Sequence, residues 1–187
     1  EPVLRIRAVL AMLIFMSVTM LLTPMVLPLT APPFSLSHTQ VGLFGLAGAA
    51  GALGAARAGR QSDRGRAQRT TCIGLSAMLL SWGLIAMLPW SIWAMVIGVI
   101  VIDFGLQSVH VANQSLIYRV RPEAQSRLTA GYMIFYSIGS ATGSMASTMV
   151  YAHAGWNGVC LAGALVSGAA LLFWALTRHL TPRDTAA

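Results

Sequence analysis

The chain has 187 residues, of which 56% are hydrophobic and only 9% are charged, far below the roughly 25% of charged residues in a typical soluble domain. It carries 12 arginines, no lysine and five acidic residues, which gives a formal net charge of +7. The missing lysine excludes a Walker-type phosphate loop and a Schiff-base enzyme, because both need a lysine amine. The composition therefore predicts a membrane protein.

Long apolar stretches predict six transmembrane helices, which make up a single transmembrane domain followed by a tail over residues 177–187. Each stretch is long enough to cross a bilayer. The expected spans are residues 8–30, 39–58, 70–89, 92–118, 128–152 and 156–176.

All the arginines fall at the chain ends, in alternate connections between these spans or, for Arg57, at the end of the span that leads into such a connection. The other connections, over residues 31–38, 90–91 and 153–155, contain no Lys, Arg, Asp or Glu. Loops rich in arginine stay in the cytoplasm. We therefore expect the arginine-rich face and both termini to be cytoplasmic, and we expect the basic surplus to contact anionic lipid rather than nucleic acid.

The six spans divide into two triplets of similar character. In the first span, Pro24 and Pro28 lie four residues apart and are expected to bend the helix. The second helix of each triplet is rich in small residues that allow close packing between helices. These packing glycines are Gly45, Gly48, Gly51 and Gly54 in one triplet and Gly139 and Gly143 in the other. Because three crossings invert the second triplet, the sequence predicts an all-α fold of two inverted three-helix repeats, a pattern typical of secondary transporters.

A polar stripe in the fourth span contains Asp103, the charged residue that lies deepest in a predicted helix. It follows an eleven-residue uncharged run, which places it roughly 16 to 18 Å along the helix, near the middle of the membrane. Gln107, His110 and Gln114 follow on the same face, and Asn113 flanks them. The stripe is expected to line a substrate or proton path, in which Asp103 exchanges a proton and His110 relays it. The alternative is a hydrogen-bond network that only joins helices.

The connection over residues 59–69 places one acid among clustered arginines at the end of a helix. Such a cluster is either an ion-pair hub or a solvated loop that sets topology. It resembles a shortened copy of the G-x-x-x-D-R-x-G-R-R signature of the major facilitator superfamily, with one residue fewer. The matching residues are Gly59, Asp63, Arg64, Gly65 and Arg66.

The resemblance to the major facilitator superfamily implies that the chain is the C-terminal six-helix half of a twelve-helix transporter. The segments around Asp103 and residues 121–127 are similar to bacterial drug/proton antiporters and arabinose-efflux-like permeases. The resemblance also implies that the protein lies in the bacterial inner membrane and transports small molecules, with protons as the coupling ion. Its implied partners are a missing N-terminal half or a dimer partner and the lipid bilayer; no cofactor, metal, nucleic acid or enzymatic activity is expected.

The leading hypothesis is therefore proton-coupled efflux by alternating access. Helical phase suggests Thr19, Thr23, Tyr132 and Tyr136 as further cavity residues. Two alternatives remain open. One is a rhomboid-like intramembrane serine protease, because residues 74–77 approach a GxSG pattern around Ser76 and His110 lies at comparable depth. The other is a non-transporting membrane scaffold or sensor.

Overall fold

The computed structural model of the protein describes residues 2–120 and 122–181, without the side chains at positions 52, 55 and 63. The expected tail therefore lies outside the described residues from position 182 onward, as does Arg121 in the fourth connection. The described chain is mostly helical. Its elements are α1 (Pro2–Leu22), α2 (Val26–Thr30), α3 (His38–Gly42), α4 (Phe44–Asp63), α5 (Ala67–Ala86), α6 (Ile92–Val120), a short 3-10 turn η1 (Pro122–Ala124), α7 (Gln125–Thr177) and a second 3-10 turn η2 (Arg178–Leu180).

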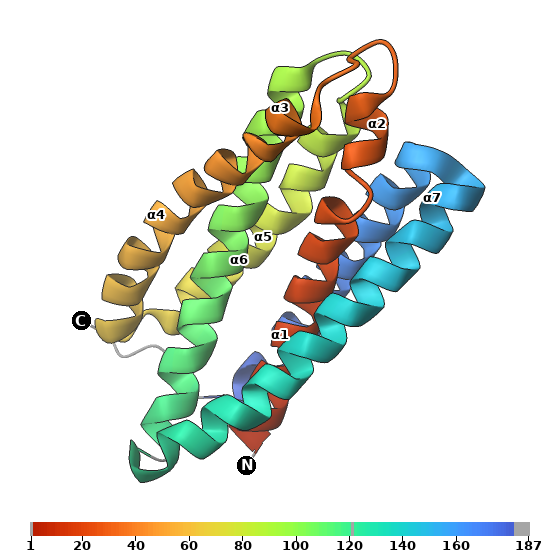
Figure 1. Ribbon diagram of the computed structural model, residues 1–187. Helices are drawn as coiled ribbons and strands as arrows, with labels where there is room; N and C mark the ends of the chain where they lie inside the picture. The colour runs from red at the N-terminus through yellow and green to blue at the C-terminus, as the bar shows by residue number, and fades with distance from the viewer. Residues whose placement is uncertain (1, 121, 182–187) are drawn as a thin grey trace.

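The helices form an elongated bundle, shown in Figure 1. Helix α7 consists of two helices joined at Gly155, whose backbone has φ 60° and ψ −159°, and the chain reverses direction there (Figure 1). A positive φ is readily adopted only by glycine, so Gly155 permits this reversal. The N-terminus, the α4–α5 turn and the α6–α7 connection lie at one end of the bundle, while α2, α3 and the bend of α7 lie at the other (Figure 1).

Five helical stretches are long and apolar enough to cross a membrane. They are Pro2–Thr30, His38–Ser62, Ala67–Ala86, Ile92–Val120 and Pro122–Leu180, of which the last includes the bend at Gly155. The protein is therefore a multi-pass, all-helical membrane protein in the part of the chain that the structure describes.

Proline divides the first hydrophobic stretch into two helices. Helix α1 begins at Pro2, earlier than the expected span, and ends at Leu22; Pro24 lies in the turn that follows. Proline has no amide hydrogen to donate to the preceding helical turn, so the helix cannot continue regularly through it. Pro28 lies in the short helix α2.

Helix α1 packs mainly against α7, and both α4 and α5 pack against α6. Gly139 and Gly143 allow α1 to approach α7 closely, because a Cβ atom at Gly143 would lie only 2.9 Å from the Cα of Met16. The core also contains large buried side chains such as Leu10, Trp82 and Ile85. Small residues at the crossings let the helix backbones make van der Waals contact, which replaces the hydrophobic effect inside a membrane.

Candidate functional site

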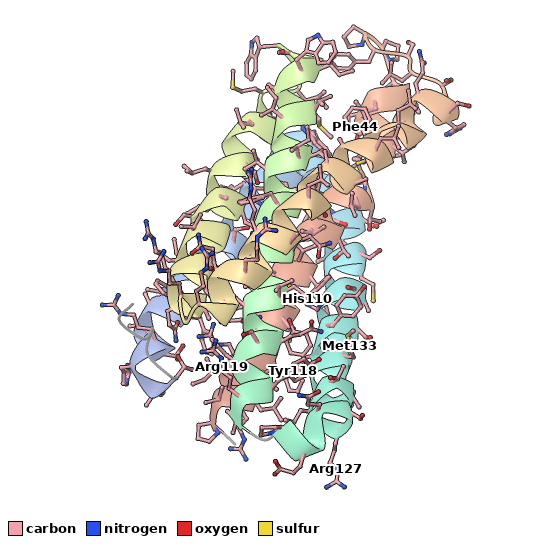
Figure 2. The ribbon with its side chains drawn as sticks, turned by 90° about the vertical axis from the view of Figure 1, so that its left-hand side faces the viewer. Phe44, His110, Tyr118, Arg119, Arg127 and Met133 are labelled. Atoms are coloured by element: carbon pink, nitrogen blue, oxygen red, sulfur yellow. The ribbon has the colours of Figure 1, made fainter. Side chains whose placement is uncertain are left out.

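The largest described cavity that holds residues of the predicted polar stripe lies between α1, α3, α4 and α6. It has a volume of about 760 Å³, and both Asp103 and Gln107 line it from α6. Its remaining lining is mostly apolar: Val18, Leu21, Leu22, Met25, Val26, Val41, Gly42, Phe44, Gly45, Gly48, Ala49, Val99 and Ile102, with His38. Phe44, labelled in Figure 2, lies toward the end of the bundle opposite the labelled Arg119 and Arg127. The cavity therefore occupies the middle of the bundle and the arginine-poor end.

Asp103 lies beside the glycines of α4. Its Cγ would be 4.0 Å from a Cβ atom at Gly48, and its Cβ and Oδ2 would be 2.8 Å from one at Gly51. Small residues here leave space for the carboxyl group next to the α4 backbone. Among the described residues, the side chains of Asp103 and Gln107 have no hydrogen-bond or ion-pair partner, and both are half-buried. Two polar groups in an apolar cavity are thus available to bind a ligand or a proton.

The next two residues of the stripe, His110 and Asn113, belong to a different environment. His110 Nδ1 and the hydroxyl of Tyr132 are hydrogen-bonded at 2.9 Å, and Asn113 Nδ2 donates to the same hydroxyl at 3.4 Å. Asn113 Oδ1 accepts from Arg7 Nη1 at 3.4 Å. Tyr132 and Asn113 are almost fully buried. These side chains therefore join α1, α6 and α7 within the protein.

Arg7 connects this network to α5 and to the segment after η2. The residue is fully buried, and its guanidinium donates to Thr71 Oγ1 at 3.2 Å, Gln68 Oε1 at 2.9 Å and Thr181 Oγ1 at 3.3 Å. Gln68 Oε1 also accepts from the indole of Trp174 at 2.9 Å. Sequence reasoning treated Arg7 only as one of the arginines that set topology. No signal separates it from the neighbouring Arg5, because burial depends on helix rotation.

Aromatic rings extend the His110 group. Phe15 contacts His110 edge to face at 5.3 Å between ring centroids, and it contacts Tyr136 at 3.9 Å. Thr23 donates to the hydroxyl of Ser144 at 3.0 Å, whereas the hydroxyl of Thr19 donates to carbonyls of its own helix. The two tyrosines lie in α7, Thr19 lies in α1 beside Gly143 of α7, and Thr23 lies in the turn after α1. None of these four residues lines the Asp103 cavity.

Gln114, the last residue of the stripe, lines a different cavity near the arginine-rich end. This cavity has a volume of about 560 Å³ and also includes Tyr118 and Arg119. The structure therefore brings Asp103 together with Gln107 and His110 together with Asn113, but it does not bring all five residues to one site.

The loop that matches the family signature caps helix α4. Gly65 has φ 78°, its amide donates to Ser62 O at 3.0 Å, and the amide of Arg66 donates to Gln61 O at 3.0 Å. These two bonds are those of a Schellman motif, in which a left-handed residue, usually glycine, ends the helix. Arg64 is the C-cap of α4 and Arg66 the N-cap of α5.

The other two signature residues lie in α4. Gly59 is in the last part of that helix, and Asp63 is its final residue, but the side chain of Asp63 lies outside the described part of the chain. Arg119 at the end of α6 donates to the carbonyl of Ser62, which joins the ends of α4 and α6. An arginine at this position also complements the negative end of the helix dipole.

A second buried polar cluster lies deep in the bundle and was not expected. The hydroxyls of Ser17 and Ser167 are 2.8 Å apart, and the indole of Trp82 donates to them at 3.0 and 3.1 Å respectively. The cluster joins α1, α5 and α7. Serine and tryptophan are common in apolar helices, so spacing along the chain could not have paired them.

The structure does not favour the serine-protease alternative, because no described hydrogen bond joins Ser76 to His110. Ser76 lies in α5, and the described hydrogen-bond partner of His110 Nδ1 is Tyr132 of α7. Within residues 2–120 and 122–181, no group of three or more His, Cys, Asp or Glu side chains could hold a metal ion.

Comparison with known proteins identifies the family. The family model described as Major Facilitator Superfamily matches residues 8–187. The chain is 49% identical over 174 residues to the YgaY transporter sequence of Escherichia coli K12, and 50% identical over 174 residues to that of E. coli O157:H7, both described as uncharacterized. Each alignment covers 93% of this chain and 44% of the relative, so the chain spans less than half the length of these relatives. No solved structure matches. The family match covers nearly the whole chain, and the chain therefore belongs to the Major Facilitator Superfamily.

Proposed function

We propose that this chain forms the C-terminal six-helix half of a twelve-helix secondary transporter. Members of this superfamily are generally not enzymes. The proposal is supported by the family match and by the coverage of 44% of each curated relative. Within the family, we assign it to the drug/proton antiporter or arabinose-efflux-like group. The missing half, or a second copy, would complete the substrate path.

In this proposal α1 and α2 together form the first membrane span, and α3 and α4 together form the second. Helix α5 is the third span, α6 is the fourth, and the two parts of α7 are the fifth and sixth. Each group of three forms one of two inverted repeats. The helix lengths and the reversal at Gly155 support this division. The arginine-rich end faces the cytoplasm of a bacterium, because positive residues are retained on that side of the inner membrane.

The Asp103 cavity is the observation on which the proposed transport function depends. One carboxyl and one amide, both without described protein partners, lie among apolar side chains in a space of about 760 Å³. Binding pockets for small organic molecules are commonly of this size and character. The chemistry favours an apolar substrate that is uncharged or positively charged, since a cation could pair with the carboxylate.

Asp103 is the proposed proton-exchanging group. Alternating access requires a site that binds the substrate on one side and a proton on the other, and an ionisable residue near mid-membrane is suited to both. The His110–Tyr132–Asn113–Arg7 network and the α4–α5 turn lie closer to the arginine-rich end, where the helices of the closed state would meet. We assign them to the gate on that side rather than to substrate binding.

The test is transport by the full-length gene product reconstituted in lipid vesicles. An imposed pH gradient should drive accumulation of ethidium, an apolar cation, together with counter-flow of protons reported by a pH-sensitive dye. Asp103→Asn should abolish the proton-driven component, and Asp103→Glu should retain part of it because it keeps a carboxyl group. Glu123→Gln is the matched control, since it removes an exposed acid that does not line the cavity.

Two results would count against the proposal. Full proton-driven transport by Asp103→Asn would exclude Asp103 as the proton-exchanging group. Absence of flux for ethidium and for a panel of uncharged apolar compounds, in protein that is correctly folded and carries both halves, would favour the scaffold or sensor alternative.

A further inference from the structure

A separate cavity at the arginine-rich end lies between α4, α5 and α6. It has a volume of about 380 Å³. Its lining consists of Arg57, Ala58, Gln61, Arg66, Arg69, Thr70, Ile73, Phe104 and Ser108. It shares no lining residue with the Asp103 cavity. Cytoplasmic topology explains why arginines lie at this end, but it does not require three of them to border one cavity.

The charge of this cavity favours an anion. Arg57, Arg66 and Arg69 contribute three guanidinium groups, and none of the described residues that line it is acidic. Guanidinium groups bind phosphate through paired, charge-assisted hydrogen bonds. The hydroxyls of Thr70 and Ser108 and the amide of Gln61 supply further hydrogen-bonding groups.

The start of helix α5 adds to this positive potential. Arg66 is the N-cap of α5, and its own side chain makes no capping hydrogen bond. The N-terminus of a 20-residue helix carries a partial positive charge that stabilises a nearby anion. The helix end and the arginines therefore act in the same direction.

The apolar part of the lining identifies the type of anion. Ile73 of α5 is 51% exposed. Ile73 and Phe104 of α6 line the part of the cavity that is deeper in the membrane than the arginines. A free phosphate ion would gain nothing from these side chains, whereas the acyl chain of a lipid would pack against them. Basic cavities between transmembrane helices are suited to lipid phosphates for this reason. We propose that this cavity binds the phosphate of an anionic phospholipid whose acyl chain lies along Ile73.

Native mass spectrometry of the full-length protein in detergent tests this proposal, with phosphatidylglycerol as the probe and phosphatidylcholine as the zwitterionic comparison. Phosphatidylglycerol should bind more tightly than phosphatidylcholine. The variant Arg57→Gln/Arg66→Gln/Arg69→Gln should bind phosphatidylglycerol roughly tenfold or more weakly, because each arginine near a lipid phosphate contributes measurably to binding.

The matched control is Arg5→Gln/Arg60→Gln/Arg127→Gln, which removes the same charge from residues that do not line the cavity. The control should keep tight binding. The double variant Arg57→Gln/Arg66→Gln leaves Arg69 intact and replaces the triple variant if that one does not fold. Equal loss in the cavity variant and the control would overturn the proposal, because general surface charge would then explain binding. Displacement of the lipid by millimolar inorganic phosphate would also overturn it, in favour of a site for free phosphate.

Discussion

Replacing Gly143 with alanine should separate α1 from α7 and destabilise the protein. A Cβ atom at this position would lie 2.9 Å from the Cα of Met16, and still closer to Met16 O and Thr19 Oγ1. The obstructing atoms include backbone, so rotation of a side chain cannot relieve the contact. The two helices must move apart along part of their length.

The magnitude follows from this geometry. Carbon atoms in favourable contact are about 3.5 to 4.0 Å apart, so the backbones must separate by on the order of 1 Å. Overpacking of this kind costs about 1 to 3 kcal/mol. Alanine also has a higher helix propensity than glycine, by up to about 1 kcal/mol, and this gain offsets part of the cost.

Gly131→Ala is the matched control, because nothing lies within 4 Å of a Cβ atom at Gly131 in the same helix. Both substitutions gain the same propensity, so the difference between them measures the steric cost alone. Unfolding in mixed micelles by increasing amounts of sodium dodecyl sulfate, followed by tryptophan fluorescence, gives the two free energies. Gly143→Ala should be about 1 to 3 kcal/mol less stable than Gly131→Ala.

The double variant Gly139→Ala/Gly143→Ala provides a second check. Both glycines face α1, with a Cβ atom at Gly139 placed 2.8 Å from the Cα of Met12. One separation of α1 from α7 would relieve both contacts, so the combined cost should be less than the sum of the single costs. Equal stability of Gly143→Ala and Gly131→Ala would refute the proposed close packing of these helices.

Three further predictions concern other parts of the molecule. Gly65→Ala forces a left-handed backbone on alanine and should lower the free energy of unfolding by about 1 to 2 kcal/mol, while Gly65→Asn should cost less. Gly51→Ala places a Cβ atom 2.8 Å from the Asp103 carboxyl and should reduce proton-driven ethidium transport by roughly tenfold. The control Gly83→Ala, whose Cβ atom would meet nothing within 4 Å, should leave this transport unchanged. Trp82→Phe removes a donor to two buried serine hydroxyls and should cost about 1 kcal/mol of stability in the same micelle assay; unchanged unfolding would contradict it.

The polar stripe shows that helical phase does not predict the partners of each side chain. Positions 103, 107, 110 and 114 lie on one face of α6 by phase, but eleven residues extend about 16 Å along a helix. Over that length the neighbouring helices change, and the side chains therefore meet an open cavity, a buried network and a second cavity in turn. Phase alone describes direction around the helix axis, not the partners met along it.

The sequence by itself determined the class of the protein, because long uncharged stretches and arginines confined to alternate connections leave few arrangements other than a multi-pass helical membrane protein. It also predicted a functional role for Asp103 and close helix packing at the small residues near Gly143, because a carboxyl group and repeated glycines are unusual within apolar helices. Only the tertiary structure decided that Arg7 is buried, that Trp82 joins two distant serines, and that three arginines border one cavity. Those facts depend on how the helices rotate and cross, which is fixed by contacts between residues far apart in the chain.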